Sequence, residues 1–238
     1  ADLERYSEAL DALESYLLRH PDDTEMRFEA ARMADAGGRP AAAARHCAIL
    51  LERQPEEREL AQALARLYFQ SDQVKRALDV IRGQHDRFHD KLSMALPVQW
   101  AIHYTREGKY PERALACIGL AMSQRTNAAE RAALTTLSAE SRLQLGQTNA
   151  AMATLLQAYR ENPTVNTAIL RLGALWADQP DATNRLARQA QRERDAHATL
   201  LILAATQQAL DDNAAAAATL KDDYARRLRA GYFPAEAV

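Results

Sequence analysis

Apolar side chains recur at helical spacing from the start of the chain as far as Leu17. Leu10, Leu13 and Leu17 fall three or four positions apart, so they share one face of a helix. Pro21 follows at the end of this pattern, and the residue before a proline is pushed out of the α region. The pattern therefore predicts one amphipathic helix over residues 1–21 that ends just before this proline.

The same arrangement returns along the chain as a small residue, an apolar residue four positions later and a closing proline. Ala9 corresponds to Ala43 and Pro21 to Pro55, and the two steps are equal in length. Later copies pair Ala77 with Ile81, Ala114 with Ile118, and Ala151 with Leu155, the last closed by Pro163. A small residue at this place suits a close helix crossing, because a larger side chain would hold the two helices apart.

The predicted elements are helical hairpins, each closed by a turn rich in glycine, aspartate or other turn-forming residues. The predicted turns are 37–40, 71–72, 108–110, 146–148, 180–181 and 211–213. The chain then divides into a half repeat (1–21), repeats (about 24–56, 57–93, 94–127 and 128–164) and degenerate repeats (165–197 and 198–230). Residues 1–230 are predicted to form a single array, and residues 231–238 a frayed tail.

A period of about 34 residues with this alanine, apolar residue and proline resembles the tetratricopeptide repeat (TPR). The resemblance covers residues 1–163 and is weaker over 164–230. It implies an all-α, right-handed superhelical solenoid of antiparallel helix pairs. In that family the first helices line a concave groove, the second helices form the outer surface, and members usually bind peptides or proteins. A generic helical bundle, or another solenoid built from helix pairs, stays the alternative.

Positions carried over from the family place candidate partner-binding side chains on the first helices of two repeats. They are Glu25, Phe28, Arg32 and Asp35 in one repeat, and Glu59, Gln62, Arg66 and Phe69 in the next. Arg32 and Arg66 are one repeat apart and are expected to stack along one wall, where two guanidiniums would suit a carboxylate-bearing peptide. The alternative is a solvated face on which the two arginines pair with Glu25 and Glu59.

The composition fits a folded chain without a signature for nucleic acid or membrane. Hydrophobic residues make up 47% of the chain, and the formal net charge of −2 provides no basic field for either partner. No apolar run approaches the roughly 18 residues of a membrane span. Cys47 and Cys117 lie in different repeats and are expected to be unpaired core residues. The expected partner is another protein, with no nucleic acid and no direct membrane insertion.

Catalytic and metal-binding motifs are absent from the sequence in any recognisable form. His85 and His89 lie four positions apart, but no further ligand has a suitable spacing, so a hydrated helix end is favoured. The other histidines are isolated, and neither a phosphate-binding glycine loop nor a nucleophile elbow is present. Trp100 and Trp176 fall at core positions and are expected to pack. The sequence predicts a non-enzyme with no cofactor and no metal.

The irregular, alanine-rich and arginine-biased repeats resemble periplasmic TPR regions of bacterial outer-membrane proteins that export exopolysaccharides, as in the Pel, cellulose and poly-N-acetylglucosamine (PNAG) systems. The resemblance implies a biofilm machine whose array recruits a periplasmic polysaccharide-modifying enzyme. The missing front half of the first repeat indicates a segment of a longer array. One alternative is direct polysaccharide or peptide binding, to which Phe28, Phe69, Glu25 and Glu59 are suited. The other is a cytosolic adaptor or regulator.

Overall fold

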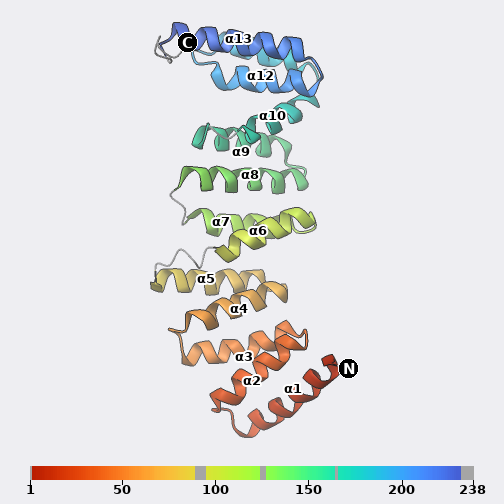
Figure 1. Cartoon of the computed structure of the whole chain (residues 1–238), viewed down its shortest axis with the longest axis vertical. Helices are drawn as coiled ribbons and strands as arrows, with labels where there is room; N and C mark the ends of the chain where they lie inside the picture. The colour runs from red at the N-terminus through yellow and green to blue at the C-terminus, as the bar shows by residue number, and fades with distance from the viewer. Residues whose placement is uncertain (1, 89–94, 124–126, 164–165, 232–238) are drawn as a thin grey trace. The chain divides into compact units, whose positions relative to one another are not determined.

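Helices joined by short turns and loops make up the part of the chain that the computed structural model describes, residues 2–88, 95–123, 127–163 and 166–231. These residues form thirteen α-helices and no β-strand, so the predicted all-α class is confirmed. The chain divides into two compact units, Ala1–Gln124 and Arg125–Val238. In each unit, helices pack mainly on their neighbours in the sequence (Figure 1). The predicted frayed tail, apart from Gly231, lies outside the described residues.

The first unit is a series of helical hairpins with a single helix in front. Its helices are α1 (Asp2–Arg19), α2 (Thr24–Ala36), α3 (Pro40–Arg53), α4 (Arg58–Gln70), α5 (Val74–Phe88), α6 (Ala95–Glu107) and α7 (Pro111–Ser123). The pairs α2–α3, α4–α5 and α6–α7 are the predicted hairpins. Because α3 also packs against α4, one apolar core continues from α1 to α4. This is the packing expected when a hairpin cannot bury its apolar face alone.

The second unit contains two regular hairpins separated by an irregular pair of helices. Its helices are α8 (Ala128–Gln144), α9 (Thr148–Glu161), α10 (Thr167–Ala177), α11 (Ala182–Arg192), α12 (His197–Ala209) and α13 (Asn213–Arg229). The pairs α8–α9 and α12–α13 pack as predicted. The two helices of the degenerate repeat 165–197 form, but α10 packs mainly against α12 and only slightly against α11.

Gly173 explains why α10 lies so close to α12. A Cβ atom added at this position would lie 2.5 Å from Ala205 Cβ and 2.6 Å from the carbonyl carbon of the same residue. Real Cβ atoms do not come so close, so only glycine permits this crossing. The predicted pairing within residues 165–197 is therefore replaced by a longer-range contact that the repeat pattern does not contain.

Each predicted hairpin turn contains one residue in the left-handed backbone region. These residues are Gly38 (φ 67°), Asp72 (66°), Gly108 (69°), Gly146 (71°), Asp181 (55°) and Asp211 (61°). Glycine adopts this region at no steric cost, and aspartate tolerates it better than most residues. The composition of the turns thus determines where each helix ends, and the six predicted turn positions are confirmed.

The small residue of the repeat lies at the centre of the packing. Ala43, Ala77, Ala114 and Ala151 are all 0% exposed. Their apolar companions one helical turn later are also buried: Cys47, Ile81, Ile118 and Leu155. These buried positions are the ones at which the sequence predicts a close helix crossing.

Arginine side chains near the ends of α3 and α5 bond the proline-containing loops that precede α2 and α4. Arg53 donates to Pro21 O at 3.2 Å and Asp22 Oδ1 at 2.7 Å, and Arg87 donates to Pro55 O at 2.8 Å and Glu56 Oε1 at 3.3 Å. The two contacts are one repeat apart. A guanidinium carries five donors in a planar fork, so it can bond a carbonyl and a carboxylate together. The need for a side chain that bonds a carbonyl and a carboxylate together gives the arginine bias of the sequence a structural role.

Replacing Ala43 with tryptophan should destabilise the first unit, because the crossing leaves no space for a ring. Overpacking of this kind costs about 1–3 kcal/mol and sometimes more. Urea unfolding followed by circular dichroism measures the free energy of unfolding. Ala41→Trp is the matched control, since Ala41 lies on the same helix but is exposed. Equal stability of the two variants would contradict tight packing around Ala43.

Alanine substitutions at two glycines of the first unit should have opposite effects on stability. Both glycines have open space where a Cβ would lie, but only Gly38 has a positive φ. Gly38→Ala should cost about 1–2 kcal/mol of unfolding free energy because of the left-handed backbone. Gly83→Ala, inside α5, should stabilise by about 0.5–1 kcal/mol because alanine favours the helix. Changes of the same sign, measured by chemical unfolding, would argue against the turn conformation.

Candidate functional site

A cavity of ≈ 590 Å³ lies between the first helices of two successive repeats, α2 and α4, with α3 beneath it. We call it the α2–α4 cavity. Its apolar lining consists of Ala31, Cys47, Leu50, Leu60, Ala63 and Leu67. Phe28 also lines the cavity and is 52% exposed. The volume falls within the range of ligand pockets, so the cavity has room for one or two side chains of a partner.

Most of the candidate groove residues lie together at this cavity. Glu25, Phe28, Arg32, Glu59 and Arg66 all line it, although they come from two repeats. Asp35 lines it as well. The helices α2 and α4 run in the same direction, because each is the first helix of a hairpin. Equivalent positions of the two repeats therefore face the same open space.

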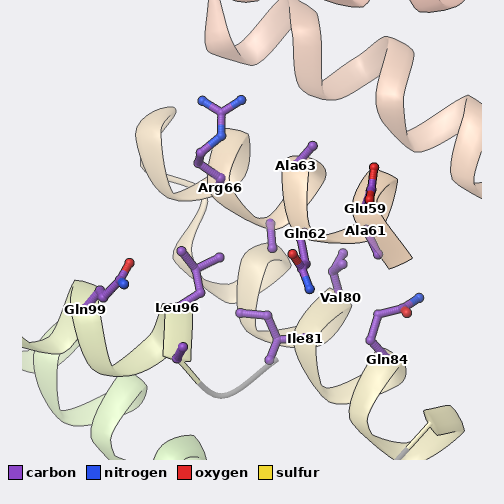
Figure 2. Close-up of a pocket in the computed structure, with 12 residues that line it drawn as sticks. Glu59, Ala61, Gln62, Ala63, Arg66, Val80, Ile81, Gln84, Leu96 and Gln99 are labelled. Atoms are coloured by element: carbon purple, nitrogen blue, oxygen red, sulfur yellow. The ribbon is translucent and has the colours of Figure 1, made fainter. Parts of the chain in front are cut away.

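Gln62 lies on the other side of α4. Figure 2 shows its side chain pointing from α4 toward Val80 and Ile81, whereas Ala63 and Arg66 point the opposite way. A second cavity of ≈ 430 Å³ lies on this side, lined by residues of α4, α5 and α6. Its polar lining residues are Glu59, Gln62, Arg66, Gln84 and Gln99. Helix α4 thus forms a wall shared by two neighbouring cavities.

Phe69 is not a groove residue, contrary to the sequence interpretation. Its side chain is 2% exposed and stacks on Trp100, with ring centroids 5.0 Å apart and ring planes 14° apart. Phe69 lies near the end of α4 and contacts Trp100 of α6, and this contact buries the ring. Packing of Trp100 is confirmed. Direct polysaccharide binding consequently loses one of its two expected aromatic platforms.

The two groove arginines are both engaged in ion pairs. Arg32 Nη1 lies 2.7 Å from Glu29 Oε1, and Arg66 Nη2 lies 2.8 Å from Asp35 Oδ2. The sequence had suggested Glu25 and Glu59 as their partners, and neither forms an ion pair with a residue that the structure describes. A carboxylate-bearing ligand would have to displace Glu29 or Asp35 from its arginine.

Sequence reasoning missed Glu57 and the contribution of α3. Glu57 precedes α4 and lines the α2–α4 cavity. It lies one repeat after Asp23, the N-cap of α2, so the repeat register contained the signal. From α3, Cys47 contributes to the apolar lining. Burial raises the pKa of the Cys47 thiol to about 11, so it stays protonated near neutral pH.

Two histidines that look isolated in the sequence have carboxylate partners in the fold. His197 Nδ1 lies 2.9 Å from both carboxylate oxygens of Asp223, a buried residue on α13. His46 Nε2 lies 3.3 Å from Glu14 Oε1, and His46 is buried between α1, α2 and α3. The partners are 26 and 32 residues away, so no local motif could have indicated them.

Other chemistry that the sequence raised has no support in the described residues. No group of three or more metal-ligating side chains occurs among them, and His89 of the considered histidine pair lies outside them. Two of the arginines in α11 have partners in the same unit. Arg185 lies 5.0 Å from the ring centroid of Trp176, and Arg188 pairs with Asp181 at 2.9 Å. Within the described part of the chain, no helix has the length and apolar character needed to cross a bilayer.

Comparison with protein-family models gives no match to this sequence, and comparison with curated proteins gives none either. A proposal for the function therefore rests on the fold and the α2–α4 cavity.

Stability should fall on mild acidification, in part because of His46. Burial lowers the pKa of this histidine, while the hydrogen bond to Glu14 raises it by a smaller amount. The unfolded chain therefore binds more protons than the folded chain as pH falls through about 6.5, which favours unfolding. His46→Gln should weaken the decline in unfolding free energy between neutral and mildly acidic pH.

The exposed His103 provides the matched control for this measurement. His103→Gln should leave the acid-dependent decline close to that of the wild type. A decline that is unchanged in His46→Gln would mean that other groups account for the pH dependence.

Proposed function

We propose that this chain is a non-catalytic protein-interaction scaffold of TPR type that binds a segment of a partner protein in the α2–α4 cavity. The observation that carries the proposal is the exposed aromatic ring of Phe28 beside the apolar part of a cavity of ≈ 590 Å³. Exposed aromatic side chains next to apolar pockets are frequent anchors of protein interfaces. The repeat architecture supports the same reading, because stacked helical hairpins present extended binding surfaces.

The finer proposal places this scaffold in the periplasm, as part of an exopolysaccharide secretion machine that recruits a polysaccharide-modifying enzyme. It is supported by the irregular, alanine-rich and arginine-biased character of the repeats, which resembles the arrays of such proteins. A cytosolic adaptor is the competing proposal. A signal sequence at the start of the full-length protein would distinguish the two compartments.

Removing the ring of Phe28 should abolish capture of the partner. The purified chain, immobilised as bait in native extract, is compared with Phe28→Ala by mass spectrometry of the bound proteins. Loss of the apolar anchor should reduce recovery of the specific partner by about tenfold or more. The helical content of the variant should be unchanged, since the ring is half exposed.

Leu210→Ala is the matched control for this capture experiment. Leu210 is 51% exposed, close to the value for Phe28, and it does not line the α2–α4 cavity. This variant should recover the partner as well as the wild type. Equal recovery with Phe28→Ala would place the binding surface elsewhere on the chain and would overturn the proposal.

A further inference from the structure

The charges around the α2–α4 cavity are unevenly balanced. Both of its arginines are already paired, Arg32 with Glu29 and Arg66 with Asp35. Three further acidic side chains line the cavity: Glu25, Glu57 and Glu59. All three are exposed, and none forms an ion pair with a residue that the structure describes. The charge that remains unpaired in the cavity is therefore negative, although two arginines line it.

The unpaired carboxylates lie at one end of the cavity. Glu25 is in the first turn of α2, Glu57 immediately precedes α4, and Glu59 is in the first turn of α4. Because α2 and α4 run in the same direction, these positions are at the same end. Arg32 is seven residues further along α2 than Glu25, about 10 Å at 1.5 Å per residue. The cavity thus has an acidic end, an apolar middle beside Phe28 and a neutralised end with two ion pairs.

We infer that the cavity binds a protein segment in which an apolar side chain is flanked by lysine or arginine. The apolar side chain enters the lining formed by Leu50, Leu60 and Leu67, next to Phe28. The basic side chain reaches Glu25, Glu57 and Glu59 at the acidic end. This inference rests on the proposed scaffold function, and it adds the chemistry of the partner.

The positions of the three carboxylates reduce the electrostatic cost of gathering them at one end of the cavity. Glu25 and Glu59 each lie near a helix N-terminus, where the helix dipole favours negative charge. The two helices therefore tolerate neighbouring carboxylates that would otherwise repel one another. A cationic group from a partner relieves the remaining repulsion, which is how complementary charges select partners and speed association.

An acidic ligand fits the same cavity poorly. Its carboxylate or phosphate would meet Glu25, Glu57 and Glu59 at one end and would compete with Glu29 or Asp35 for an arginine at the other. Like charges placed together at an interface strongly disfavour binding. The carboxylate-binding role considered for Arg32 and Arg66 from the sequence is thus the less favourable use of this site.

Selection from a library of random peptides displayed on phage, with the purified chain as target, tests this inference. Enriched peptides should contain an apolar residue beside lysine or arginine. One enriched peptide is then synthesised with a fluorophore, and its affinity is measured by fluorescence anisotropy at low and high salt. The wild-type affinity should fall as salt increases, because exposed charges are screened.

Neutralising the acidic end should lower the affinity for this peptide by about tenfold and remove most of the salt dependence of its binding. The variant is Glu25→Gln with Glu57→Gln and Glu59→Gln. The matched control is Glu52→Gln with Glu107→Gln and Glu112→Gln, three exposed acids of the same unit that do not line the cavity. Glu112 lies in the first turn of α7, so the control also removes a carboxylate from a helix N-terminus. The control should bind as the wild type does.

The possible outcomes separate this inference from the proposed function. Enrichment of acidic or uncharged peptides that still require Phe28 would overturn the charge preference and leave the groove function intact. A peptide set that does not depend on Phe28 would overturn both. Equal binding of poly-lysine, which has no apolar anchor, would point to a cationic polymer as the ligand and would overturn the choice of a protein segment.

Discussion

Close contact between helices at alanine is the constraint on which this structure depends. A helical hairpin has apolar residues on two faces and can bury only one of them within itself. The second face is covered by the next hairpin, and the helices approach closely enough because Ala43, Ala77, Ala114 and Ala151 have almost no side chain at the crossing. The α2–α4 cavity follows from the same geometry. Two first helices face the same open side, while α3 supplies the apolar residues beneath them.

Arginine serves this architecture in two distinct ways. At the hairpin ends, Arg53 and Arg87 bond backbone carbonyls and carboxylates of the preceding loop, and so join one repeat to the next. On the open side, Arg32 and Arg66 neutralise acidic neighbours, which leaves the carboxylates at the other end of the cavity to determine its charge. An exposed ion pair contributes little to stability by itself. The larger effect of Arg53 and Arg87 is on geometry, and that of Arg32 and Arg66 is on the charge of the cavity.

The sequence predicts the local features of this fold well and the long-range ones poorly. Turn positions such as Gly38 and Asp211 were predictable because the left-handed backbone restricts which residues can occupy them. The buried alanines were predictable because the crossing recurs once in each repeat. The orientation of Phe69 was not, since each residue along a helix turns the side chain by about 100° and a small error in register moves it from groove to core. The close contact of Gly173 with α12 and the pairing of His197 with Asp223 join distant parts of the sequence, which no periodic pattern encodes.

Packing between sequence neighbours also affects the speed at which this protein acquires its structure. Most helix contacts in each unit join elements that are adjacent along the chain, with α10 on α12 as the main exception, so few long loops must close before packing begins. Chains with mostly local contacts fold quickly, in microseconds to milliseconds. A hairpin that has just left the ribosome can dock on the one before it without waiting for the rest of the polypeptide. The architecture that creates the cavity therefore also lets each unit assemble in step with its synthesis.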